Sequence, residues 1–473
     1  MKRTHYAICF ALVLALLAIS GGAQQSPGRG GQQPVSTFHT DVPAHPYDLI
    51  LGRPERDRIT LSILNYADAE AYVEYGAQAG EYSARTPLRQ LKEGIPAEVV
   101  LPPLQPDTGY HYRLRLRSPG AAAFSETPDH AFHTQRPSGS AFTFTIIADS
   151  HLDERADPTL YARTLANALA DRPDFHLDLG DTFMTDKHVD LTDASKQYLA
   201  QRYYLGLLGS SAPVFLVGGN HDGEVSGAFG ETNSMAAWSN SWRRALFSSP
   251  LPDGFYTGNA EPLQDYYAWE WGDASFVVLD PYWYTPRRRG TDDNWTATLG
   301  AAQYQWLKQT LETSHAKLRF VFIHQLVGGD GKNGRGGVEA VPFFEWGGHN
   351  ADGSEGFAAR RPGWDMPIHQ LLVRNHVSVV FHGHDHLFAK QDLGGIVYQE
   401  VPQPAFPGRA NPNLATDWGY KAGVLLGSSG HMRVTVADGK ARVEYIRAAL
   451  SGDEALVGRN GSVLYSYEVH GQP

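Results

Sequence analysis

Five short apolar segments of this sequence each end directly in residues whose side chains bind metals. Side chains alternate between the two faces of a strand, so an Asp-x-His or His-x-His pattern at a strand end places two donors on one side. Taken singly, each pattern also fits a turn or a packed histidine, but five in one chain favour a shared metal site. The donors after these segments are Asp149 and His151, Asp181, Asn220 with His221 and Asp222, His324, and His384 with His386.

The donor set is made of carboxylates, imidazoles and one amide, without sulfur. The chain has 20 His and a single Cys, Cys9, which lies in an apolar run near the amino terminus. Oxygen and imidazole ligands without thiolates are typical of divalent first-row metals. Gly180, Gly219 and Gly383 lie within these motifs and allow sharp backbone turns beside the ligands. The sequence therefore predicts a site for two divalent ions.

The overall composition excludes one broad class of protein and argues against another. With 42% hydrophobic residues, the chain has enough apolar material for a sizeable core, which excludes a disordered protein. Lys and Arg number 40 and Asp and Glu number 51, which gives a net charge of −11. A protein that binds duplex nucleic acid usually carries a basic excess, so we expect no such binding.

The amino terminus has the pattern of a secretory signal peptide. Lys2 and Arg3 precede an apolar run over residues 6–19, and small residues follow at Gly21-Gly22-Ala23. The run is short for a membrane span, so we predict a cleaved signal peptide over residues 1–23 and no stable membrane anchor; the alternative is an uncleaved anchor. This predicts an exported protein, periplasmic or extracellular. Residues 24–40 are rich in Gln, Gly and Pro and predict a flexible leader.

Residues 41–136 carry only strand signals. Ile59 to Ile63, Ala71 to Tyr75 and Tyr110 to Leu116 are short alternating runs separated by turn residues, a pattern that predicts an all-β sandwich. The segment from Leu104 to Tyr110 resembles the turn and corner tyrosine of fibronectin type III modules. Residues 137–140 then mark a domain boundary.

Strands and helices alternate in the second domain, residues 141–473. Its strands are expected near residues 141–148, 174–179, 214–217, 276–279, 319–323 and 378–381. Its helices are expected after Asp157-Pro158 and over 194–208 and 301–313. This alternation is typical of an α/β domain whose ligand-binding groups lie at the ends of strands.

The order of the five motifs resembles that of the calcineurin-like metallophosphoesterases, from Asp-x-His through Gly-Asp, Gly-Asn-His-Asp and a strand-end His to Gly-His-x-His. The resemblance extends over about residues 141–449. A β-sandwich in front resembles purple acid phosphatases and their bacterial relatives. The resemblance to the metallophosphoesterases implies that the second domain is a four-layer α/β domain, with a core of two sheets flanked by helices. Two differences stand out: Met184 occupies the position of the metal-binding tyrosine of purple enzymes, and His151 has no counterpart in them. A tyrosinate-bound ferric centre is therefore not expected.

The resemblance also implies a role for each donor. One ion would be held by Asp149, His151, Asp181 and His386, and the other by Asp181, Asn220, His324 and His384, so that Asp181 bridges the pair. The metals would be two divalent transition-metal ions, such as Mn, Fe or Zn. His221 would face the scissile ester, and Asp222 would orient His221.

The function implied by this resemblance is hydrolysis of phosphate monoesters, diesters or both. A hydroxide that bridges the metals would attack phosphorus in line, and His221 would protonate the leaving oxygen or stabilise its charge. The alternative is a surface or glycan-binding protein with an inactive esterase domain. The complete set of ligands argues against that alternative.

Three further residues are candidates for binding the phosphate or the leaving group: Asn350, Arg360 and Arg361. They belong to a stretch over residues 328–363 that is long for a loop and is rich in Gly, Asn, Arg and Trp. Long insertions of this kind often bind substrate or cover a site. The basic run Arg287-Arg288-Arg289 is either a solvated loop or a rim that attracts anions.

Overall fold

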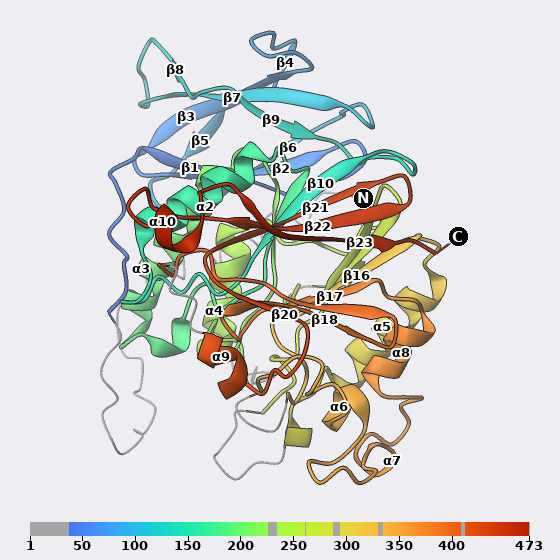
Figure 1. Cartoon of the computed structure of the whole chain (residues 1–473). Helices are drawn as coiled ribbons and strands as arrows, with labels where there is room; N and C mark the ends of the chain where they lie inside the picture. Colours follow the sequence, from blue (N-terminus) through green and yellow to red (C-terminus); the bar gives the residue numbers. More distant parts are fainter. Residues whose placement is uncertain are drawn as a thin grey trace.

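The computed structural model describes residues 37–225, 234–260, 262–286, 294–329, 334–407 and 412–472. The predicted signal peptide and Arg287–Arg289 lie outside these residues, as does most of the predicted leader. A β-rich part comes first and lies at the top of Figure 1, and a larger α/β part follows it. Within the described part of the chain, no helix is both long and apolar enough to span a membrane.

The N-terminal part consists of two antiparallel sheets that enclose one apolar cluster. Strands β3 and β7 alternate between buried and half-exposed residues along their length, as expected for strands with one covered face. The hydroxyl of Tyr110 accepts a hydrogen bond from the backbone N–H of Gln105 (2.9 Å) across the corner before β7. The first sheet contains β1 (Tyr47–Gly52), β2 (Ile59–Asn65) and β6 (Ala97–Leu101), and the second contains β3 (Ala69–Gly76), β4 (Ala84–Arg85), β5 (Arg89–Leu91), β7 (Gly109–Arg117), β8 (Ser125–Glu126) and β9 (His130–His133).

Two larger sheets form the centre of the α/β part. The first has the order β12 (Val214–Leu216), β11 (Phe175–Asp178), β10 (Phe142–Ile147), β21 (Gly430–Ala437), β22 (Lys440–Arg447) and β23 (Val463–His470). The second has the order β13 (Thr257–Gly258), β14 (Tyr267–Trp271), β15 (Ala274–Val278), β16 (Leu318–Phe322), β17 (Val379–His382), β19 (Ile396–Glu400), β18 (Leu387–Leu393) and β20 (Val424–Gly427).

The central strands of these sheets are buried on both faces, because each sheet has the other sheet on one side and helices on the other. Phe144 and Phe322 point into an aromatic core between the sheets, whereas their neighbours Ile147 and Val321 pack against helices outside. Helices α2 (Pro158–Ala170), α3 (Leu191–Gly209) and α4 (Met235–Leu246) lie on the side of the first sheet, and α5 (Gly300–Thr313) and α8 (Ile368–Arg374) on the side of the second (Figure 1). The result is the four-layer α/β arrangement that the sequence predicted.

The shorter helices lie in connections and near the C-terminus. Helix α2 begins as predicted, with the carboxylate of Asp157 accepting hydrogen bonds from two backbone N–H groups and Pro158 in the first turn. Two brief helices in the 328–363 stretch show that it is partly structured. The remaining helices are α6 (Phe344–Gly347), α7 (Phe357–Arg360), α9 (Pro412–Asp417) and α10 (Glu454–Val457).

Residues 37–40, the end of the predicted leader, contact the α/β part. Phe38 forms an isolated antiparallel bridge with Asp153, and its ring stacks on His188 at 4.2 Å between centroids. The backbone N–H of His39 donates to the carbonyl of Leu152 (2.7 Å). This short segment is therefore held beside the loop that follows β10 and is not free.

Candidate dinuclear metal centre

The predicted ligands converge where parallel strands of both large sheets end. Strands β10, β11 and β12 are parallel in one sheet, and β16 and β17 are parallel in the other. The carboxyl ends of parallel strands meet at one edge of a sheet, so the loops that follow them lie together. One site thus receives side chains from five loops that are far apart in the sequence.

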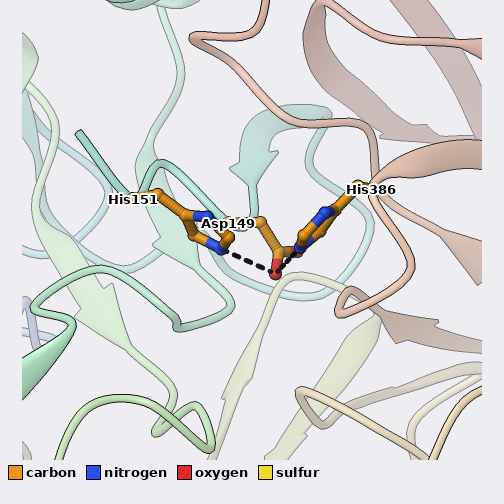
Figure 2. A group of neighbouring side chains, drawn as sticks. All are labelled: Asp149, His151 and His386. Atoms are coloured by element: carbon orange, nitrogen blue, oxygen red, sulfur yellow. Dashed lines mark ion pairs between the residues drawn. The ribbon is translucent and has the colours of Figure 1, made fainter. Parts of the chain in front are cut away.

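Asp149, His151 and His386 form the first group of possible ligands. Figure 2 shows the two imidazoles on either side of the Asp149 carboxylate. The Nε2 atoms of His151 and His386 lie 3.6 Å and 3.4 Å from Asp149 Oδ1. One donor atom from each residue lies within 4.8 Å of the others, which is close enough for all three to bind one ion.

Asp181, His324 and His384 form the second group, and all three are buried. His324 Nε2 lies 3.4 Å from Asp181 Oδ2 and 3.3 Å from His384 Nδ1. The side-chain oxygen of Asn220 is 3.2 Å from the same His324 nitrogen. The other ring nitrogen of His324 is 2.9 Å from the backbone carbonyl of Leu179, which fixes the orientation of the ring.

The Asp181 carboxylate lies between the two groups. Its Oδ2 atom is 3.4 Å from His324 Nε2 in the second group and 3.8 Å from His151 Nε2 in the first. This placement supports the expectation that Asp181 bridges two ions.

The fit of this site to metal ions rests on buried atoms that have no hydrogen-bond partner among the described residues. Asp149 Oδ1 and both ring nitrogens of His151 are such atoms. An unpartnered buried polar atom is costly, so Asp149 Oδ1 and the His151 Nε2 that faces it call for a ligand, whereas His151 Nδ1 lies 3.6 Å from Asp153 Oδ2. Two donors that each lie about 2.0–2.2 Å from one ion are roughly 3–4 Å apart, which matches the separations within both groups. The residues present therefore fit two divalent cations.

The backbone of the ligand loops is strained. Asp149, His151, Asp181, His384 and His386 all have positive φ, between 49° and 79°. Non-glycine residues adopt this region at a cost of about 1–3 kcal/mol each, and they do so mainly where the surrounding structure enforces it. The ligands of one loop alternate with residues that contact other groups, as Ser150 does with Gln201 and Asp385 with Tyr420.

A close approach between two loops explains one glycine of the predicted motifs. A Cβ atom added to Gly219 would lie 2.1 Å from the backbone nitrogen of Asp181, far inside van der Waals contact. Any other residue at position 219 would push the loop of Asn220 away from the loop of Asp181. The glycine therefore sets the spacing between these two predicted ligands.

The charges of the site balance in the absence of cations. Burial lowers the pKa of His151, but the neighbouring Asp149 and Asp153 carboxylates more than reverse this and raise it to about 9. Burial likewise lowers the pKa of His324, and Asp181 and Asp149 raise it to about 10. These imidazoles are thus protonated at neutral pH and neutralise the two ligand carboxylates until metals take their place.

His221 lies beside the second group of ligands. Its backbone N–H donates to Asp181 Oδ1 (2.8 Å), and its ring Nδ1 lies 3.0 Å from Asp186 Oδ1. About a quarter of its side-chain surface is exposed, whereas Asp181, His324 and His384 of the second group are buried. A ring held on one side by a carboxylate and open on the other can exchange a proton with a bound molecule.

The structure corrects the predicted partner of His221. Asp222 does not orient the imidazole; its carboxylate accepts hydrogen bonds from the backbone N–H groups of Asp181, Thr182, Phe183 and Gly219, at 2.7–3.1 Å. It thus fastens the loop of Asp181 to the loop of Asn220. Asp186 is the residue that contacts the ring, and the sequence analysis missed it. It follows Asp181 by five residues in a 3₁₀ turn, a spacing that carries no recognisable signal.

The three predicted substrate residues do not join this cluster. Arg361 forms an ion pair with Glu345 and donates to the carbonyls of Trp295 and Ala297. Asn350 accepts from the indole N–H of Trp295 (2.9 Å) and donates to Ser354. These contacts serve the fold of the insertion. Arg360 is exposed at the end of α7, and none of its described contacts involves a metal-ligand candidate.

Comparison with known proteins agrees with this geometry. The model of the calcineurin-like phosphoesterase family matches residues 142–388, which is more than half of the chain. The protein belongs to the calcineurin-like phosphoesterase family, whose members are metal-dependent phosphoester hydrolases that typically use two divalent ions.

Two solved structures share the fold over most of its length. One, described as the structure of PhoD, has 13% sequence identity and a TM-score of 0.63, and the match covers 92% of this chain and 93% of PhoD. The other is purple acid phosphatase PPD1 from yellow lupin (Lupinus luteus) seeds, with 15% identity, a TM-score of 0.59, and coverage of 89% and 74%. No curated protein matches the chain at a significant level of sequence similarity.

Proposed function

We propose that this protein hydrolyses phosphate monoesters, diesters or both at the two adjoining ligand groups. The observation that carries the proposal is the placement of Asp181 between Asp149–His151–His386 and His324–His384. One ion would be held by Asp149, His151, Asp181 and His386. The other would be held by Asp181, Asn220, His324 and His384.

Two bound divalent ions would lower the pKa of a shared water and neutralise charge on the phosphoryl oxygens. The chain itself supplies the remaining functions. His221, on the open side of the second group, donates a proton to the leaving oxygen or stabilises its charge. Asp186 holds the His221 ring through Nδ1 and leaves Nε2 to face the substrate. Asp222 keeps the loops of Asp181 and Asn220 together.

The proposal extends to the organisation and location of the protein. We assign residues 1–23 to a signal peptide, 41–136 to a fibronectin type III-like sandwich and 141–473 to the esterase domain. The hydrogen bond between Tyr110 and Gln105 supports the fibronectin-like assignment, since a tyrosine corner of this kind recurs in such sandwiches. Export to the periplasm or the extracellular space follows from the signal peptide.

The test combines metal analysis with a panel of esters. Purified protein is assayed by mass spectrometry for bound metal and then for turnover of matched monoesters and diesters. We expect two ions per chain and turnover that is lost on chelation and restored by a divalent ion. Full activity with one ion or none would contradict the proposal. Two bound ions without turnover of any ester would favour a binding protein with an inactive esterase domain.

A further inference from the structure

Two buried glutamines on helix α3 contact the loops that carry the ligands of the first metal. The amide nitrogen of Gln197 donates to the carbonyls of His151 (2.7 Å) and Thr182 (3.2 Å). That of Gln201 donates to the hydroxyl of Ser150 (2.9 Å) and to the same Thr182 carbonyl (2.8 Å). Each amide thus joins the loop after β10 to the loop after β11.

The two glutamines are one helical turn apart, so they project from the same face of α3. Both are fully buried. The hydroxyl of Tyr161 donates to the side-chain oxygen of Gln201 (3.1 Å). This hydrogen bond orients the amide so that its nitrogen faces the loops. A helix that buries polar groups on its inner face has no clean apolar stripe. Gln197 and Gln201 therefore occupy inner positions of α3 where apolar side chains would ordinarily pack, and they use these positions to form hydrogen bonds.

The loops that they join need such support. Asp149, His151 and Asp181 all adopt positive φ, a conformation that persists only where several contacts enforce it. Two backbone hydrogen bonds already link the loops, from the N–H of Asp149 to the carbonyl of Gly180 and from the N–H of His151 to the carbonyl of Asp181. The glutamines add a second row of contacts on the helix side.

We propose that Gln197 and Gln201 are positioning residues that set the distance between His151 and Asp181 and so determine the affinity of the first metal site. The inference rests on the proposed function. It predicts an asymmetry, because His324 and His384 follow β16 and β17 of the other sheet and have no described contact with either glutamine. Loss of a glutamine should therefore weaken the first ion more than the second.

The test is a calorimetric titration of metal-free protein with Mn²⁺. It is carried out on the wild type, Gln197→Met and Gln201→Met. Methionine keeps the length of the side chain and removes the N–H donors. Loss of an outer contact to a metal ligand typically lowers affinity by about 10- to 100-fold. We expect that loss for one of two ions, with a smaller loss for the other because Asp181 contributes to both, and activity that returns toward normal at high Mn²⁺.

Gln303→Met is the matched control. Gln303 is also a fully buried glutamine on a helix, but its amide donates to the carbonyls of Asp280 and Leu299, neither of which is a candidate ligand or adjoins one in the sequence, as Ser150 and Thr182 do. This variant should lose thermal stability while both Mn²⁺ affinities stay at the wild-type level. Gln201→Met is the milder test variant because Gln197 still donates to the carbonyl of the ligand candidate His151 as well as to that of Thr182, and it decides the question if Gln197→Met does not fold.

The outcomes separate this inference from the proposed function. Wild-type protein that binds fewer than two Mn²⁺ ions would overturn the proposed function and this inference with it. Two ions in the wild type and unchanged affinities in a folded Gln201→Met variant would overturn the positioning role alone. Equal weakening of both ions, or the same weakening in Gln303→Met, would also overturn it.

Discussion

The N-terminal sheets and the ligand loops of the α/β part are stabilised in opposite ways. In the sandwich, apolar side chains fill the centre and charged residues pair across strands at the surface, as Arg117 does with Glu70 and Arg113 with Glu74. In the ligand loops, carboxylates and imidazoles are buried, several atoms have no partner in the described structure, and the backbone is strained. The first arrangement stabilises the fold. The second costs free energy in the metal-free protein, and metal binding can offset that cost.

Asp181→Asn should have the largest effect, because it removes a charge that both metal groups share. We expect turnover to fall by more than the roughly 10²- to 10⁴-fold that a general acid contributes, together with lower metal occupancy. Asp149→Asn changes a ligand of one group only and should cost less. Steady-state kinetics and metal analysis of both variants measure the difference. Near-normal turnover with two ions in Asp181→Asn would show that the bridge is assigned wrongly.

His221→Ala should leave both ions bound and lower the rate by about 10²- to 10⁴-fold. The loss should be greatest for alkyl esters, whose leaving oxygen needs a proton, and smallest for nitrophenyl esters. His369→Ala is a control, since His369 lies on helix α8, contacts Tyr398 of β19 and has no described contact with a ligand candidate. A uniform loss across leaving groups would indicate stabilisation of charge instead of proton donation. Loss of metal would make His221 a ligand.

Metal affinity should rise with pH, because ions displace protons from the site. In the metal-free protein the pKa of His151 is about 9 and that of His324 about 10, raised by Asp149 and Asp181 against the effect of burial. Below pH 9 each ion must displace one proton, from His151 or from His324, so the affinity for each ion should fall by up to about tenfold for each pH unit of acidification. Calorimetry in buffers of different ionisation enthalpy measures the protons released. Constant affinity from pH 6 to pH 9 would contradict this charge balance.

Asp186→Asn tests the corrected partner of His221. The change keeps the size of the side chain and removes the charge that holds the ring through Nδ1. We expect about a tenfold loss of turnover, smaller than that of His221→Ala, with the same dependence on leaving group and both ions retained. Asp193→Asn is the control, since Asp193 pairs with Lys196 on the surface of α3. Equal effects of the two variants would remove Asp186 from the site.

The same comparison explains what the sequence could and could not predict. The strands that end in ligands were confirmed because apolar runs followed by donors are local features, as at Ile146-Ile147-Ala148 before Asp149. The partners of His221 could not be assigned in this way. Asp222 is its neighbour in sequence, yet its carboxylate is drawn to four backbone N–H groups, and the ring turns to Asp186.

The ion pair of Arg361 in the insertion could not be predicted for a related reason. A cation in a long polar loop suggests an anion site, but whether the charge is free depends on distant residues. Arg361 lies beside the buried carboxylate of Glu345, whose charge burial would otherwise penalise. The spacing of Arg361 and Glu345 along the chain does not predict this ion pair, which is seen only in the folded structure.

The smallest expected effect concerns the contact between the two parts of the molecule. The hydroxyl of buried Tyr112 in β7 donates to the carbonyl of Ser210 at the end of α3 (2.6 Å). Tyr112→Phe should lower the free energy of unfolding by about 0.5–1.5 kcal/mol and leave turnover and metal content unchanged.

Tyr110→Phe is the matched variant, because the hydroxyl of Tyr110 accepts a hydrogen bond from Gln105 within the sandwich. If the two parts unfold as one unit, both variants should shift a single thermal transition. If the sandwich unfolds separately, Tyr110→Phe should lower only the sandwich transition. A loss of turnover in Tyr112→Phe would show that the sandwich also positions the metal loops, and the contrast between the two regions would fail.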